Sequence, residues 1–327
     1  MPEETVYLPM PMQTPVWVHR FAVVTAVATW LLIFVGGLVT STGSGLAVPD
    51  WPLSFGQVFP PMVGGVLFEH GHRLAAACVG MLTVTLVVLL SRWEPRAWVR
   101  WVARAALLAV LLQGLLGGVT VLLRLPTAVS VAHACLAQAF LCLTVVLAVC
   151  TAPAWHTHCV LWVETTSPAL PTLAMATTAF VYLQLILGAL MRHTGAGLAI
   201  PDFPLAFGRV WPPLTSQAVV IHFLHRLGAV VVTLSIGWTV ARILRAYRAE
   251  KRLLYPASVL TALLLMQLTL GALTIWTRRA VLPMTAHVAV GAAVLATSLL
   301  LVLWSSRLVR VSVSVPERHL VSKQVMA

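Results

Sequence analysis

The stretch TGSGLAVPDWPLSFGQVFPP occupies residues 42–61, and TGAGLAIPDFPLAFGRVWPP occupies residues 194–213. Fourteen of the twenty aligned positions are identical, and the two stretches begin 152 residues apart (194 − 42). Further matches flank both copies, including LLQGLLGGVT at 111–120 with LMQLTLGALT at 265–274. A repeat of this length indicates a structural unit that occurs twice in the chain.

The composition identifies the class of protein to which this unit belongs. Of the 327 residues, 60% are apolar and only 9% are charged, and the mean hydropathy is +0.94. Such a chain belongs with membrane proteins, in which roughly 20 apolar residues span the bilayer as a helix. We predict eight spans, at residues 21–40, 66–91, 105–123, 127–150, 172–191, 218–241, 253–276 and 281–304. Residues 1–20 lack the basic region of a cleavable signal, so the first span is expected to persist.

The repeat divides the eight spans into two units of four. We predict an all-α integral membrane protein built from two tandem four-helix bundles. An even number of spans brings both units into the membrane in the same direction, which predicts a pseudo-twofold axis along the membrane normal. The expected segments are an N-terminal tail (1–20), a first bundle (21–150), a linker (151–171), a second bundle (172–305) and a C-terminal tail (306–327).

The net charge of +12 has a membrane explanation. Basic residues gather after the second span, after the sixth span and in the C-terminal tail, as the positive-inside rule expects. This distribution predicts a multi-pass protein of the plasma membrane with both termini in the cytoplasm and the repeated loops on the outer face. It favours the lipid bilayer as the partner of these charges and gives no reason to expect nucleic-acid binding.

Four histidines recur in register within the predicted spans: His72 matches His225, and His133 matches His287. An ionisable side chain in a membrane span is costly and usually faces a cavity or a ligand. One such histidine is often a polar contact between helices, but four in matched positions favour a ligand. Each unit offers one histidine from its second helix and one from its fourth, in the outer half of the bilayer. Two imidazoles across a bundle core are typical of axial ligands to a haem iron.

Several other repeated residues lie near these histidines. Asp50 and Asp202 are expected to be helix N-caps in a short cap over each bundle. Arg73 and Arg226 are candidates for pairing with haem propionates, with anchoring at the membrane interface as the alternative. Glycines in the third span, including Gly117, favour either close approach of a macrocycle or ordinary helix packing.

The two units differ three positions before the first repeated histidine. Glu69 precedes His72, whereas His222 precedes His225. Residues i and i+3 share a helix face, so Glu69 is expected to face the same pocket as His72. A carboxylate in an apolar setting needs a partner or a role. We interpret Glu69 as a proton acceptor, with a salt bridge to Arg73 as the alternative.

Two neighbouring histidines complete the candidate set. His70 and His222 are candidates for contacts with the edge of a haem.

The two outward loops, the Glu69-x-x-His72-Arg73 segment and the four histidines together resemble haem A synthase, over residues 20–305. This resemblance implies oxidation of the C8 methyl of haem O to a formyl group, which gives haem A for cytochrome oxidase. It implies a haem b cofactor on His225 and His287. It implies that the substrate haem O binds at His72 and His133.

The resemblance also suggests partners, and the sequence departs from the family at one point. Haem O synthase (a farnesyltransferase) and an electron-transfer protein are the expected partners. Many bacterial members carry a cysteine pair in an outward loop, but neither repeated loop here contains cysteine, so a thiol-dependent step is not expected.

Two other classes of protein remain open from the sequence. A di-haem b-type electron-transfer protein, such as a quinol oxidoreductase, would carry haem b at both sites and would not need Glu69. A transporter built on a duplicated bundle would carry no haem. Two routes also remain open for the methyl oxidation, one by electron removal followed by water addition, the other by oxygen activation at iron.

Overall fold

The computed structural model describes residues 14–156 and 162–311, and these residues are mostly helical. Within them, eight helices are long and apolar enough to cross a membrane, as predicted, so the chain is a multi-pass membrane protein. The long helices are α1 (Val16–Ser41), α2 (Gly65–Trp93), α3 (Ala97–Leu122), α4 (Thr127–Cys150), α6 (Leu170–His193), α7 (Gln217–Ala246), α8 (Lys251–Trp276) and α9 (Val281–Leu308). The short elements are α5 (Pro153–His156), the 3-10 helix η1 (Ala196–Leu198), β1 (Trp162–Glu164) and β2 (Val309–Val311).

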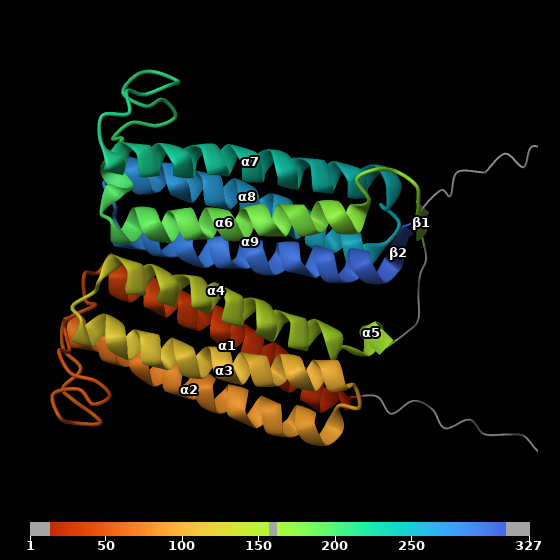
Figure 1. Cartoon of the computed structure of the whole chain (residues 1–327), viewed down its shortest axis with the longest axis horizontal. Helices are drawn as coiled ribbons and strands as arrows, with labels where there is room; N and C mark the ends of the chain where they lie inside the picture. Colours follow the sequence, from red (N-terminus) through yellow and green to blue (C-terminus); the bar gives the residue numbers. More distant parts are fainter. Residues whose placement is uncertain (1–13, 157–161, 312–327) are drawn as a thin grey trace, which may run out of the picture.

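The helices pack as two groups of four (Figure 1). In the first group each helix from α1 to α4 contacts the next, and α1 also contacts α4. Helices α6 to α9 repeat this arrangement. Each group has its own apolar core, with Leu86 and Phe140 in the first and Ile243 and Leu295 in the second. The twofold relation between the groups stays a prediction.

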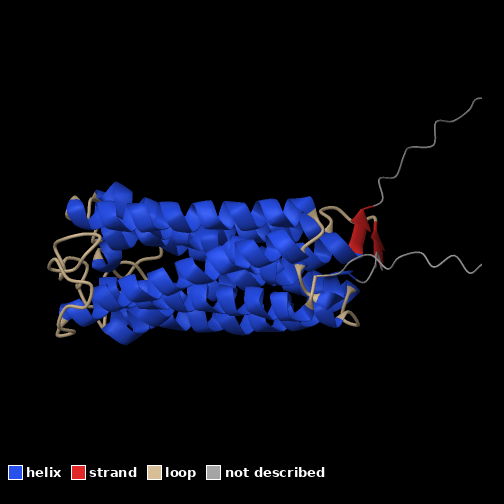
Figure 2. Ribbon diagram, turned by 90° about the horizontal axis from the view of Figure 1, so that it is seen from below, coloured by secondary structure: helices blue, strands red, loops and turns tan. Residues whose placement is uncertain are grey.

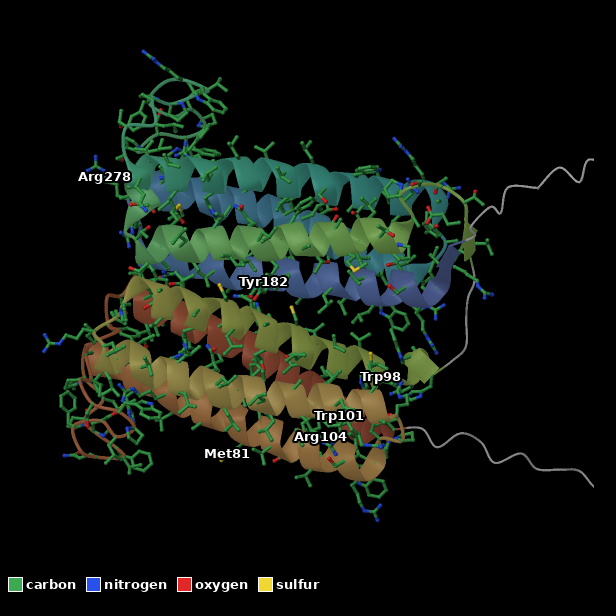
Figure 3. All side chains as sticks on the ribbon, in the orientation of Figure 1. Met81, Trp98, Trp101, Arg104, Tyr182 and Arg278 are labelled. Atoms are coloured by element: carbon green, nitrogen blue, oxygen red, sulfur yellow. The ribbon has the colours of Figure 1, made fainter. Side chains whose placement is uncertain are left out.

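The outward surfaces of the helices are apolar, which suits contact with lipid. Met81 of α2 is 63% exposed and lies on the outer side of the first group (Figure 3). Proline lies immediately before α1 and α4, as Pro15 and Pro126. The first turn of a helix leaves its N–H groups unpaired in any case, so the fixed backbone of proline favours a helix start at no cost in hydrogen bonds.

The two ends of the molecule differ in character. Both repeated loops lie at one end, and α1 begins and α9 finishes at the other (Figures 1 and 2). Trp98, Trp101 and Arg104 gather at the latter end, whereas Arg278 lies at the loop end (Figure 3). The Arg104 guanidinium stacks 4.7 Å from the Trp101 ring centroid. Tryptophan and arginine are typical of a membrane interface. Which face of the membrane each end meets stays a prediction.

The third span begins earlier than the predicted residue 105. Helix α3 starts at Ala97. Just before it, Glu94 accepts a hydrogen bond from Arg96 at its carboxylate and one from Arg100 at its backbone carbonyl. Burial opposes ionisation of Glu94, but hydrogen bonds from Arg96 and Thr14 outweigh it and lower the pKa of this carboxyl. The connection between α2 and α3 (residues 94–96) is therefore short. The long arginine side chains can keep their charges at the membrane surface.

The predicted linker and C-terminal tail are joined. Strands β1 and β2 pair in parallel, with Trp162 opposite Val309. Glu164 accepts hydrogen bonds from Arg242 and from the backbone N–H of Leu170, the first residue of α6. Residues 162–170 are thus fixed to the second bundle. Cys159 and the tails at residues 1–13 and 312–327 lie outside the described residues.

Candidate functional site

The four repeated histidines lie near the loop end of their helices, each within eight residues of the first residue of its helix. Each imidazole rests on a glycine of a neighbouring helix. A Cβ atom on any of these glycines would lie only 3.0–3.3 Å from the imidazole Cε1, so a larger residue would displace the ring. The pairs are Gly36–His72, Gly117–His133, Gly188–His225 and Gly271–His287.

The histidines that the sequence paired lie in the same bundle. His72 is on α2 and His133 is on α4, while His225 is on α7 and His287 is on α9. No cluster of three or more His, Cys, Asp or Glu side chains occurs in residues 14–156 and 162–311. Each site therefore offers two imidazoles, a number that suits the two axial positions of a haem iron.

In the second bundle, both imidazoles have a partner at Nδ1. His225 Nδ1 lies 3.1 Å from the side-chain Nε2 of Gln184, which also donates to the His225 carbonyl at 2.8 Å. His287 Nδ1 lies 3.2 Å from the backbone carbonyl oxygen of Gln267. A carbonyl oxygen only accepts, so this nitrogen carries the proton. Both contacts fix the orientation of a ring.

In the first bundle, neither imidazole has such a partner. Within the described residues, Nδ1 of His72 and Nδ1 of His133 are buried without a hydrogen bond. Gln113 contacts the other ring nitrogen of His133, at 3.2 Å from Nε2. Buried polar atoms without partners are uncommon in folded proteins. His72 is therefore less constrained than its counterpart His225.

The glutamines around the histidines were not identified by sequence reasoning. Gln113 and Gln267 occupy the same position of the two repeats, within the matched segments at 111–120 and 265–274. Their repetition beside a repeated histidine was the available signal. Gln184 is not repeated, because its counterpart in the first copy is Leu32.

Glu69 is buried, with 4% of its surface exposed, and both of its oxygens are engaged. Oε1 pairs with Arg73 at 2.7 Å, and Oε2 accepts the backbone N–H of Val48 at 2.9 Å. In the second copy His222 Nδ1 accepts the N–H of Ile200 at 3.3 Å. Glu69 and His222 thus hold the same position of their loops. The salt bridge that the sequence left as an alternative exists, and the proton-accepting role of Glu69 stays a prediction.

Arg73 and Arg226 bind the backbone of the repeated loops. Arg73 donates to the carbonyls of Asp50 and Leu53 at 2.7 and 2.9 Å. Arg226 donates to the matching carbonyls of Asp202 and Leu205 at 2.7 and 2.8 Å. Both arginines therefore hold a loop against the helix that follows it, and pairing with propionates stays a prediction.

The expectation that Asp50 and Asp202 cap helices is wrong. Asp50 accepts the backbone N–H groups of Phe55 and Gly56 at 2.7 and 2.8 Å, and Asp202 repeats this contact at the same distances. Phe55 and Gly56 have positive φ, which turns their N–H groups toward the carboxylate. The backbone hydrogen bonds from Gly56 and Phe55 lower the pKa of Asp50. Each aspartate closes a turn in the loop.

The two loops differ in the side chains that hold them to the second helix of their bundle. In the first loop the hydroxyl of Ser54 lies 2.8 Å from His70 Nδ1, and both side chains are buried. In the second loop Ala206 and Phe223 take these positions and belong to an apolar cluster. The first loop is thus held by polar contacts and the second by apolar packing.

Fold and site together define a class: a multi-pass helical membrane protein with two partly buried histidines in each four-helix bundle. Residues 19–299 match the family model for the cytochrome oxidase assembly protein. The chain therefore belongs to that family, and the resemblance noted in the sequence is confirmed.

Individual relatives agree with this family. A heme A synthase of Symbiobacterium thermophilum is 33% identical over 223 residues, which cover 65% of this chain and 72% of that protein. A heme A synthase of Shouchella clausii is 30% identical over 275 residues, covering 80% and 88%. One of Halalkalibacterium halodurans is 29% identical over 270 residues, covering 77% and 84%.

Proposed function

We propose that this protein is a haem A synthase, an oxidoreductase that converts the C8 methyl of haem O to a formyl group and so supplies haem A for cytochrome oxidase. The observation that carries the proposal is the pair of partly buried imidazoles on the second and fourth helices of each bundle, each ring resting on a glycine. Glycines beside the imidazoles, and the unpaired Nδ1 atoms of His72 and His133, fit a flat group whose iron is held by two histidines. The family and the relatives support the same reaction.

The two bundles have different roles in this proposal. His225 and His287 hold haem b as a resident cofactor, because both rings are fixed through Nδ1. His72 and His133 hold the substrate haem O, because rings without such partners release a ligand more readily. Bound haem b supplies one-electron redox chemistry to the protein.

The residues of the first bundle position the substrate and its proton. Glu69 is the proton acceptor, one helical turn from His72. Arg73 and the Val48 N–H hold the Glu69 carboxylate in place. A buried general base typically contributes about 10²–10⁴-fold in rate.

The topology and partners of the enzyme follow from the proposed reaction. The basic residues at the end opposite the repeated loops support a cytoplasmic location for that end in the plasma membrane. The haem sites then lie toward the outer face. Haem O synthase is the supplier of substrate, and a redox protein exchanges electrons with haem b.

The assignment of the two bundles is tested by replacing their histidines. We expect His225→Ala and His287→Ala to remove the b-type absorption spectrum of the purified protein. His72→Ala and His133→Ala should keep that spectrum but abolish haem A formation, measured by chromatography of extracted haems. A wild-type reduced spectrum in both His225→Ala and His287→Ala would overturn the cofactor assignment. Haem b at both sites, with no haem O or haem A under any supply of haem O, would instead identify an electron carrier.

The role of Glu69 is tested by Glu69→Gln. The amide keeps the size of the side chain and can still accept the Val48 N–H, but it cannot accept a proton. We expect this variant to fold, to bind haem b normally and to form haem A about 10²–10⁴-fold more slowly. Extracted haems, normalised to the haem b spectrum, give the turnover per folded molecule. A less stable protein with nearly normal turnover would show that Glu69 only anchors the loop through Arg73.

A further inference from the structure

We propose that Gln184 and Gly228 form a positioning pair that makes the haem of the second bundle a permanent cofactor. This inference rests on the proposed function, since it concerns the haem held by His225. It goes beyond that function because it names the residues that make one duplicated site retain its haem while the other releases it.

The geometry of the pair is specific. Gln184 lies on α6, and its Nε2 reaches both Nδ1 and the carbonyl oxygen of His225 on α7, at 3.1 and 2.8 Å. Gly228 follows His225 by three residues, and a Cβ atom there would overlap the Oε1 of Gln184. A larger residue at position 228 would therefore push the amide out of this position. Gln184 Oε1 itself is buried and makes no hydrogen bond in the part of the chain that the structure describes.

The first copy lacks both members of the pair. Leu32 stands at the position of Gln184, and Ala75 stands at the position of Gly228. Leucine cannot form a hydrogen bond, and His72 Nδ1 is accordingly buried without one. The glutamine and the glycine that accommodates it are thus present together in one copy and absent together from the other.

The chemistry of metal-bound histidine explains what the pair does. When one imidazole nitrogen binds iron, the other carries a proton and donates it to a partner, which fixes the ring and raises the basicity of the ligand. With Nδ1 facing Gln184, Nε2 is the nitrogen left for the iron. Half a turn of the amide exchanges its N and O atoms, so Oε1 then accepts the Nδ1 proton, and the amide gives up its hydrogen bond to the His225 carbonyl. Loss of such a partner typically weakens metal affinity by about 10–100-fold.

The test uses the purified protein with its haem b. We expect Gln184→Leu/Gly228→Ala, which recreates the pairing of the first copy, to lose haem b about 10–100-fold faster to excess apomyoglobin. We expect the midpoint potential of haem b to rise in Gln184→Leu and to fall in Gln184→Glu, because a carboxylate is a stronger acceptor than an amide. A merely structural defect would not move the potential in opposite directions. Gln113→Leu, which removes the glutamine beside His133 in the first bundle, should leave both haem b properties unchanged.

The reciprocal variant tests the same idea in the first bundle. Leu32→Gln/Ala75→Gly should slow the loss of the haem bound at His72 and leave haem b as in wild type. Unchanged haem b loss and potential in the Gln184 variants, in a protein whose wild type shows the His225-dependent b-type spectrum, would overturn the inference alone. A wild-type protein without that spectrum would overturn the proposed function instead.

Discussion

Single side chains tie each repeated loop to the helix that follows it. From the helix, Arg73 donates to carbonyl oxygens of the loop and Glu69 accepts the Val48 N–H. Within the loop, Asp50 accepts the N–H groups of Phe55 and Gly56 and closes a turn. Except for the exchange of Glu69 for His222, the second copy repeats these contacts with the same groups. The side chains that close the turns, Asp50 and Asp202, are therefore identical in the two loops, whereas Ser54 and Ala206, which hold the loops to the helix, differ.

The turn closed by Asp50 should loosen in acid. Its pKa in the folded protein is below the ordinary value of 3.8, because backbone N–H groups bind the carboxylate. The contribution to stability is complete above the unfolded pKa and is lost as the pH falls through the folded pKa. We expect pepsin to cut the loop of Asp50→Asn faster than that of wild type at pH 5, with the ratio of rates approaching one toward pH 2. A ratio independent of pH would contradict this role of the carboxylate.

At the scale of helices and loops, the two copies differ in the sizes of two residues that face each other, an aromatic residue of the loop and a small residue of the third helix. In the first copy Trp51 of the loop covers Gly118 of α3, where a Cβ atom would lie only 2.5 Å from the indole ring. In the second copy the matched residues are Phe203 and Ala272. A larger ring is thus matched by a smaller helix residue. The loop lies over helix α3, which also carries Gly117, the glycine against which the His133 ring packs.

Gly118→Ala should therefore displace the first loop. Overpacking of this kind costs about 1–3 kcal/mol. We expect a lower midpoint of thermal unfolding and faster cleavage by chymotrypsin near Phe59, which is already 76% exposed. The double variant Trp51→Phe/Gly118→Ala restores the combination found in the second copy and should recover wild-type cleavage. If the single variant resists chymotrypsin as well as wild type does, Trp51 does not anchor the loop on α3.

At the scale of the whole molecule, polar contacts supplement the apolar packing between the bundles. Trp30 of α1 donates to the carbonyl of Ala289 on α9, and Tyr182 of α6, which lies between the bundles in Figure 3, donates to the carbonyl of Cys135 on α4. Arg192, near the end of α6, donates to the Gly37 carbonyl and to the Ser41 hydroxyl at the end of α1, at 3.0 and 2.6 Å. A cation at a helix C-terminus is favoured by the helix dipole, and α1 has no basic residue in its own last turn.

Arg192→Ala should weaken the joint between the bundles. Removing a charged donor leaves the Ser41 hydroxyl and the Gly37 carbonyl without it, at a cost of about 1–3 kcal/mol. We expect a lower midpoint of thermal unfolding in detergent, and partial recovery in Arg192→Lys, which keeps the charge. Arg209→Ala, which removes an exposed arginine of the second repeated loop, serves as the control and should unfold like wild type. Equal unfolding midpoints for Arg192→Ala and the control would show that the joint depends on apolar packing alone.

Composition and spacing along the chain are enough to predict the spans, the repeat and the register of the histidines. Long apolar runs can satisfy their backbone in a membrane only as helices, so eight of them predict eight spans. The histidines were identifiable because duplication placed them in register and because a membrane makes an ionisable residue costly. Both inferences depend on local composition and spacing, which a chain displays without being folded.

The hydrogen-bond partners of these polar groups, by contrast, depend on the folded arrangement of helices and loops. The aspartates close turns instead of capping helices, because the positive φ of Phe55 and Gly56 turns two N–H groups toward the carboxylate. Arg73 and Glu69 pair and hold a loop, and the Nδ1 atoms have partners in the second bundle but not in the first. These contacts join residues from different helices and loops, and hydrogen bonds depend on distances of a few ångströms that spacing along the chain does not specify.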